Sequence, residues 1–213
     1  MLITKLGHCC LLVEENGLRI LTDPGAYSSA QDSLKNIDVV LITHEHQGHF
    51  HIPSLETVLK NNPLAKVITN KAVGKLLMER NIAFSLIEHS GKTTIKDVLI
   101  EGCGQFHTPI HSSLPPVQNT GFFIAEEFFY PGDAFYIPKK KVRILALPVA
   151  GPWMKLSDAI TYATEIKPDV CFPVHDGMLQ EGRLGPVHSL PQSILPKKGI
   201  QFVILEEGKK KEF

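Results

Sequence analysis

The chain has 213 residues, which is long enough for one domain, residues 1–213, with a substantial apolar core. Its 22 basic side chains balance 22 acidic ones, so no nucleic-acid partner is expected, and the mixed-sign run EEGKKKEF is predicted to be a solvated tail. The amino terminus does not resemble a signal peptide, no apolar run reaches ~20 residues, and the four cysteines form no CxxC pair, so we expect a cytoplasmic protein with reduced thiols and no membrane partner.

The first half of the chain predicts strands, followed by an alternation of helices and strands. An alternating pattern makes residues 2–15 a strand, and Asn16-Gly17 predicts a two-residue hairpin turn into a second strand at 18–25. The apolar run IDVVLIT, residues 37–43, is typical of a strand buried on both faces. Beyond it we predict a helix with Ser54 as its N-cap over 52–62, a strand over 65–70, a helix over 70–81, and strands over 83–88 and 96–106.

The second half of the chain repeats this layout. Its patterns predict a hairpin of two strands over 120–133, a buried strand over 142–149, an amphipathic helix over 155–167, and strands over 168–177 and 199–208. Alternating strands and helices favour an α/β fold with a parallel component. We therefore expect two similar halves, each a sheet with helices outside.

A histidine cluster follows the strand predicted at residues 37–43. Four histidines fall within eight residues of the segment THEHQGHFH: His44, His46, His49 and His51. His44 and His46 are two residues apart, so in extended backbone they point to the same side, and His49 follows within the next turn. Imidazoles grouped at the end of a buried strand are typical of a transition-metal site rather than of a histidine-rich surface loop. The segment therefore predicts a metal centre.

Three further polar residues lie at the ends of other predicted strands: His107, Asp133 and His175. Functional groups in α/β folds gather beyond the carboxyl ends of strands, so we expect these side chains to meet the histidine cluster. Cys103, four residues before His107, is either a soft metal ligand or a core residue, and we favour the core.

The motif THEHQGH, residues 43–49, resembles the T-H-x-H-x-D-H signature of the metallo-β-lactamase superfamily. Gly132-Asp133 and the PVH of residues 173–175 follow in that family's order. The segments LGHCCLLVE, LRILTDPG and LPVAGPWMKLSDAITYATEIKPDVCFPVHDGM are similar to the branch of metal-dependent hydrolases that includes the L-ascorbate-6-phosphate lactonase. The resemblance implies an αββα four-layer sandwich with a two-metal site at the edge between its two sheets.

The resemblance also implies which residues bind the metals. One metal is held by His44, His46 and His107. The other is held by His49 and His175, and Asp133 bridges both metals and takes part in catalysis. His111 is an alternative to His107; we favour His107 because it lies directly at the strand end, which leaves His111 as a catalytic or substrate-binding group.

Four more residues are predicted to surround the metal ligands. Trp153, the only tryptophan, follows a Gly-Pro turn and is predicted to bind substrate, with plain packing as the alternative. His8, Asp23 and Asp176 are predicted to hold the ligands in place through hydrogen bonds; for His8 and Asp23 the alternative is an ordinary polar role in a turn.

Gly48 departs from the family signature, which has aspartate at this position. Glycine supplies neither a ligand for the second metal nor an acceptor for the attacking water, so the second site is expected to be weakened. Other side chains that could replace the aspartate are His51, Glu45, Gln47 and Asp176.

These features together predict a metal-dependent hydrolase that acts on a small ester, lactone or phosphoester. Zn²⁺ lowers the pKa of its bound water from about 15.7 toward about 7, and the resulting hydroxide is the expected nucleophile. We expect one or two zinc ions per chain, with manganese or iron as alternatives, a small-molecule substrate, and a monomer or an oligomer. The alternative function is a non-catalytic metal- or ligand-binding protein of the same fold; a nuclease would need a basic face that the charge balance does not supply.

Overall fold

Two seven-stranded sheets pack face to face in the computed structural model, which describes residues 1–180 and 182–213. The first sheet has the order β14-β1-β2-β3-β4-β5-β6, with β1 (Leu2–Gly7), β2 (Cys10–Glu15), β3 (Leu18–Thr22), β4 (Val39–Ile42), β5 (Lys66–Thr69), β6 (Ser85–Leu86) and β14 (Lys210–Glu212). The second has the order β13-β12-β11-β10-β9-β8-β7, with β7 (Lys92–Ile95), β8 (Val98–Cys103), β9 (Gly121–Ile124), β10 (Phe128–Tyr130), β11 (Ile144–Pro148), β12 (Val170–Val174) and β13 (Gln201–Phe202).

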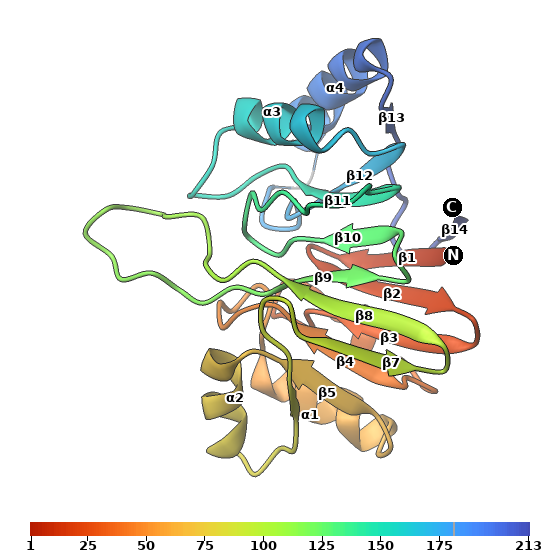
Figure 1. The fold of residues 1–213 in the computed structure, drawn as a ribbon, viewed down its shortest axis with the longest axis vertical. Helices are drawn as coiled ribbons and strands as arrows, with labels where there is room; N and C mark the ends of the chain where they lie inside the picture. Colours follow the sequence, from red (N-terminus) through yellow and green to blue (C-terminus); the bar gives the residue numbers. More distant parts are fainter. Residues whose placement is uncertain (181) are drawn as a thin grey trace.

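Helices cover the outer face of each sheet (Figure 1). On the first sheet lie α1 (Ile52–Asn61) and α2 (Lys71–Met78), and on the second lie α3 (Leu156–Ile166) and α4 (Gly185–Ile194). Two short 3₁₀ helices, η1 (Ala30–Ser33) and η2 (Leu195–Lys198), complete the described elements. None of the described helices combines the length and the apolar character needed to cross a membrane.

Three apolar clusters separate four layers. The central cluster lies between the sheets and brings Leu41 of β4 together with residues such as Phe172 of β12. A second cluster, which includes Leu55 of α1, lies between the first sheet and its helices, and a third, which includes Ala163 of α3, lies behind the second sheet. The predicted αββα sandwich is therefore confirmed.

Strand β4 shows why the continuous apolar run predicts a strand buried on both faces. Side chains alternate across a strand, so Val39 and Leu41 enter the cluster between the sheets, whereas Val40 and Ile42 enter the cluster under the helices. β4 pairs in parallel with β3 and β5, so it lies inside the sheet. Its carboxyl end delivers the histidine segment to the edge of the sandwich.

The amino-terminal segment differs from the prediction. Residues 2–15 form not one strand but the antiparallel hairpin of β1 and β2, which reverses at Gly7 (φ 131°), His8 (φ 38°) and Cys9. Only a glycine and one polar residue mark this turn in an otherwise apolar stretch, so the turn signal is weak. The Asn16-Gly17 turn between β2 and β3 is confirmed, with both residues at positive φ.

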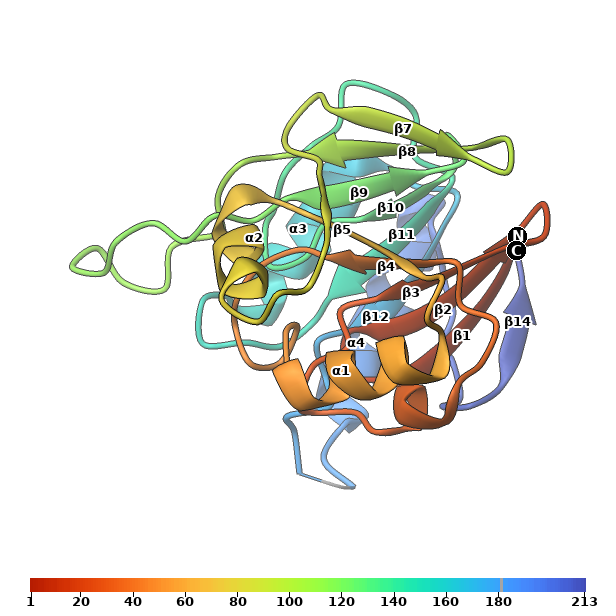
Figure 2. The ribbon, with the colours of Figure 1, turned by 90° about the horizontal axis from the view of Figure 1, so that it is seen from below.

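Other boundaries also differ. The N-cap of α1 is His51; Ser54 is buried in the first turn, where its hydroxyl lies 3.1 Å from His51 Nδ1. The strand predicted over 199–208 is reduced to β13, and the helix α4 was not predicted from the sequence. The charged tail is not simply solvated: β14 pairs antiparallel with β1, so the two termini lie side by side (Figures 1 and 2).

Candidate metal centre

Three separate segments bring histidines to a single buried carboxylate, Asp133, which a fourth segment supplies. This residue follows β10, and His175 Nε2 lies 2.8 Å from its Oδ2 atom. His49 Nε2 lies 3.1 Å from its Oδ1 atom, and His107 Nε2 lies 3.3 Å from Oδ2. His44 Nε2 is 3.7 Å from the same Oδ2 atom. The ends of β4, β8, β10 and β12 thus meet at one edge of the sandwich.

The potential ligand atoms form two groups. The first consists of His44, His46, His107 and Asp133, and the second of His8, Cys9, His49 and His175. Within each group the ligand atoms all lie within 4.8 Å of one another. The six residues predicted to bind metal are therefore together, and His111 is in neither group. His8 and Cys9 were not predicted as ligands, because residues 2–15 were predicted to form one continuous strand and the turn at these two residues was not recognised.

Several buried polar atoms of these groups have no hydrogen-bond partner among the described residues. They are His49 Nε2, His107 Nε2, Asp133 Oδ1, His175 Nδ1 and both ring nitrogens of His8. His49 Nε2 and Asp133 Oδ1 are close, but their orientation does not make a hydrogen bond. Buried polar atoms are normally paired, so this set fits a cation that binds them together.

The protonation states suit metal binding. Burial alone would raise the pKa of Asp133, but the imidazoles of His49 and His175 hold it well below its usual range. Burial lowers the pKa of His44 well below its usual value and, helped by the neighbouring His107, also lowers that of His46. The Asp133 carboxylate and the neutral His44 and His46 are therefore in the forms that bind a divalent cation. Burial alone would lower the pKa of His49, but the Asp133 carboxylate raises it well above its usual value, so a cation that binds there must displace a proton.

Asp23, at the end of β3, supports His49 from behind. Its Oδ2 atom lies 2.7 Å from His49 Nδ1 and accepts hydrogen bonds from the hydroxyls of Thr43 and Tyr130, while its Oδ1 accepts from the Thr43 backbone N–H. The bond to Nδ1 leaves His49 Nε2 free to face Asp133. Such a carboxylate behind a histidine fixes the orientation and tautomer of a metal ligand.

Asp176 does not face the ligand groups, although it follows His175 directly. Its carboxylate binds Lys5 Nζ at 2.5 Å and His188 Nε2 at 2.8 Å. Asp176 therefore has no free atom for a second metal. Cys103 lies in the apolar cluster behind the second sheet with Phe123 and Leu145, in agreement with the core alternative.

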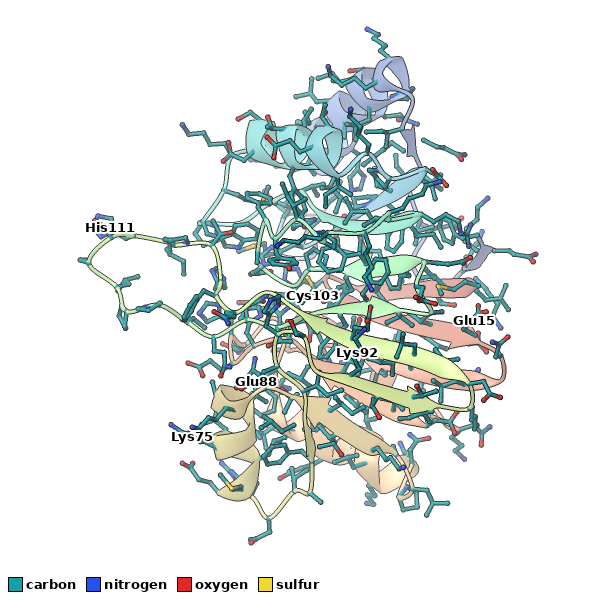
Figure 3. All side chains as sticks on the ribbon, viewed as in Figure 1. Glu15, Lys75, Glu88, Lys92, Cys103 and His111 are labelled. Atoms are coloured by element: carbon teal, nitrogen blue, oxygen red, sulfur yellow. The ribbon has the colours of Figure 1, made fainter. Side chains whose placement is uncertain are left out.

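His111 lies on the long segment between β8 and β9, away from the ligand groups. This segment projects from the sandwich, and His111 lies on its outer part (Figures 1 and 3). The ring is exposed, and its Nδ1 atom lies 2.8 Å from the Ser113 hydroxyl. His111 still lines a pocket of about 600 Å³ that begins at His46 and His107 and runs under the segment. It is therefore near a space for substrate, but not at the metal ligands.

Trp153 closes another side of the centre. Its ring is buried, with its centroid 5.5 Å from that of His107 and 5.9 Å from that of His175. The indole Nε1–H has no hydrogen-bond partner among the described residues. Trp153 lines a small pocket of about 220 Å³ directly over Asp133 and His175.

Comparisons with known proteins agree with this architecture. The sequence profile described as Beta-lactamase superfamily domain matches residues 2–175, which contain every residue of both ligand groups. The protein Rv0786c of Mycobacterium tuberculosis is 28% identical over 210 residues, which cover 93% of this chain and 98% of that protein. A UPF0173 metal-dependent hydrolase of Carboxydothermus hydrogenoformans is 26% identical over 194 residues, 82% of this chain and 84% of that protein.

The fold has a close counterpart among solved structures. Igni18, described as a novel metallo hydrolase from the archaeon Ignicoccus hospitalis, superposes with a TM-score of 0.76 at 21% identity, covering 100% of this chain and 98% of that chain. The profile match spans most of the chain, and the fold and the order of the site motifs agree with it. The chain therefore belongs to the metallo-β-lactamase superfamily.

Proposed function

We propose that this protein is a metal-dependent hydrolase that acts on a small ester, lactone or phosphoester. The observation that supports it most is the meeting of five imidazoles with the Asp133 carboxylate, where several buried polar atoms have no hydrogen-bond partner in the described part of the chain. Relatives named UPF0173 metal-dependent hydrolases and the metallo hydrolase Igni18 support the same class of reaction.

The donor set favours zinc. Imidazole nitrogens suit borderline ions such as Zn²⁺, whereas Mg²⁺ and Ca²⁺ prefer oxygen, so we expect Zn²⁺ first, with iron or Mn²⁺ as alternatives. His44, His46 and His107 would hold one ion, His49 and His175 the other, and Asp133 would contact both. A divalent cation bound here supplies a water of lowered pKa and polarises the bond that is attacked.

The protein's own residues orient the reaction and enclose it. Asp23 keeps His49 Nε2 directed at Asp133, so the ligand geometry is set before any ion arrives. The indole N–H of Trp153, which has no partner among the residues that the structure describes, is available to donate a hydrogen bond to an oxygen of the substrate. Because the pocket over the centre is small, about 220 Å³, the reacting part of the substrate must be small too.

The larger pocket suggests what the rest of the substrate looks like. Its lining of Phe106, Ile110 and Leu114 is apolar, and these three side chains are exposed on the projecting segment. A lactone or phosphoester with an apolar substituent would place its reacting group at the metals and its substituent here. His111, at the outer part of the pocket, is available to contact polar atoms of such a substituent.

A metal analysis combined with three substrates tests the proposal. Protein purified without an affinity tag is analysed for metal and then assayed with a γ-lactone, p-nitrophenyl acetate and bis(p-nitrophenyl) phosphate, before and after chelation and after zinc is restored. We expect zinc in the purified protein and turnover of at least one substrate that follows zinc content. His46→Ala should lose the ion of the first group.

The other outcomes are equally informative. Zinc without turnover of any of the three substrates favours the non-catalytic metal-binding protein. Absence of any bound divalent ion contradicts both functions.

A further inference from the structure

The surroundings of Gly48 show that its missing side chain leaves room for His8. A Cβ atom at position 48 would lie 2.9 Å from His8 Nε2 and 3.1 Å from two ring atoms of Tyr27. Real Cβ atoms essentially never approach closer than 3.0 Å, so a side chain at position 48 and the present His8 ring exclude each other. The backbone of Gly48 is not in the left-handed region, so its conformation does not require glycine. The glycine leaves the space that the His8 ring occupies.

The backbone of His8 is fixed next to the second group of ligand atoms. His8 lies in the turn between β1 and β2 at φ 38°, a conformation that non-glycine residues adopt rarely. Its carbonyl oxygen accepts a hydrogen bond of 3.1 Å from the backbone N–H of His175. Gly177 passes so close that a Cβ atom there would lie 2.8 Å from His8 Cβ. These contacts hold the His8 side chain against His175.

Apart from packing against neighbouring rings, which include Tyr27 at a centroid distance of 5.1 Å, the His8 ring has no polar contact among the described residues. It is 1% exposed, and its centroid lies 4.3 Å from that of His175 and 5.7 Å from that of His49. Within residues 1–180 and 182–213 neither of its nitrogens has a hydrogen-bond partner, although a buried polar atom is costly to leave unpaired. Cys9, the other additional member of this group, packs in the apolar cluster between the sheets instead.

We propose that His8 is a ligand of the second metal, in the space that Gly48 leaves, beside His49 and His175. The inference rests on the proposed metal centre and specifies how its second site is completed. With His8 included, this site offers three imidazoles and the shared carboxylate of Asp133. Such a set favours Zn²⁺, Co²⁺ or Ni²⁺ over the harder Mn²⁺.

An exchange of ligands between positions 8 and 48 tests this. The variants are His8→Asn, which keeps a residue that tolerates positive φ, and the double variant His8→Asn/Gly48→Asp, which removes the ring and supplies a carboxylate. The matched control is His51→Ala. It removes a histidine from the segment that contains Gly48, and the ring of this histidine contacts Ser54. Each full-length protein is stripped with chelator, and Zn²⁺ or Mn²⁺ binding is measured by calorimetry and by elemental analysis after dialysis.

We expect two zinc ions per chain in the unmodified protein and in His51→Ala. His8→Asn should keep one ion and bind the second at least ~100-fold more weakly, since even loss of an outer-shell partner costs ~10–100-fold. The double variant should recover the second ion and bind Mn²⁺ better than the unmodified protein does. If His8→Asn binds two ions with unchanged affinity, or if the unmodified protein binds only one, the inference is wrong while the proposed function stands. Binding of no ion contradicts the proposed function itself.

A second measurement does not depend on the variant folding. Anomalous scattering from zinc-loaded crystals of the unmodified protein locates the ions directly. A zinc ion at roughly 2.0–2.1 Å from a ring nitrogen of His8 supports the assignment, since this is the ordinary Zn–N distance. An ion on His49 and His175 without His8 contradicts it.

Discussion

Asp133 is the residue on which both groups of ligand atoms depend. It contacts His175, His49 and His107 within 3.3 Å, and it is the only carboxylate among the residues of the two groups. These three histidines arrive from three chain segments, so the distances between them are set by the sheets and not by sequence spacing. Each histidine should therefore act at its own site, and removal of one should affect only the ion that it contacts.

Histidines 107 and 111 provide the direct comparison. His107→Ala should reduce zinc content to one ion per chain, because its Nε2 atom lies 3.3 Å from Asp133 in the first group. His111→Ala should keep the full zinc content and change KM rather than metal binding, because its exposed ring lies along the larger pocket. Elemental analysis of both variants checks this. Zinc loss in His111→Ala with none in His107→Ala would reverse the assignment.

For single residues of the site, the sequence is informative where the local spacing fixes the direction of a side chain. His44 and His46 could be recognised because two-residue spacing at a strand end fixes their directions, and His49 because it follows within the next turn. The position of His8 could not, since its ring reaches the centre only through the turn between β1 and β2 and the absence of a side chain at position 48. Asp176 could not be assigned either, because its partner Lys5 lies 171 residues away in sequence.

Among the secondary-structure elements, the end of β3 contributes most to the order of the site. Asp23 joins β3 to Thr43 and His49 beyond β4 and to Tyr130 of β10, and all of these groups are buried. Its own φ is 39°, so the chain is held in an unfavourable conformation to place this carboxylate. The elements around the centre are therefore connected through one side chain.

Asp23→Asn should loosen this connection. The asparagine amide has only one acceptor oxygen, and its NH2 group would face groups that are themselves hydrogen-bond donors. The free energy of unfolding of the metal-free protein should therefore fall by about 2 kcal/mol. Zinc affinity should fall by ~10–100-fold because His49 is no longer oriented. Urea unfolding and zinc calorimetry measure the two effects. Asp169→Asn, at an exposed carboxylate paired with Lys141, is the control and should change stability by less than ~0.5 kcal/mol.

The elements themselves were predictable to different degrees. β4 and β11 are strong signals because both faces are buried, which demands uninterrupted apolar residues. β14 was not predictable, because an edge strand with exposed side chains is held by backbone hydrogen bonds to β1 and not by composition. α4 contains Pro191 and buries little, so its apolar pattern is weak.

In the whole molecule, the candidate metal centre lies at one edge of the sandwich, so its geometry depends on how the two sheets are held together there. Beyond the apolar cluster between the sheets, a buried ionic contact joins them there: Lys5 of β1 in the first sheet binds Asp176, which follows β12 in the second. His188 of α4 binds the other oxygen of Asp176, so the outer helix is included. Asp176 directly follows His175, so this contact holds the backbone next to a proposed metal ligand.

The same contact predicts how stability depends on pH. Burial alone would raise the pKa of Asp176, but hydrogen bonds from His188 and Lys5 lower it below its ordinary value. A carboxylate whose pKa is lower in the folded state binds fewer protons there than in the unfolded chain. Its stabilising contribution is therefore complete above the unfolded pKa of about 3.9 and is lost as pH falls through the lower, folded value.

Asp176→Asn isolates this contribution. The variant should be destabilised at pH 6 by ~3–5 kcal/mol, because the buried Lys5 loses its counter-ion, and its stability should change less than that of the unmodified protein between pH 5 and about pH 3. Urea unfolding of both metal-free proteins across this pH range gives their free energies of unfolding. In the difference between the two proteins, the contributions of the other carboxylates cancel. Parallel pH curves would mean that Asp176 is not held ionised by Lys5 and His188, and this ion pair would then not contribute to joining the sheets at this edge.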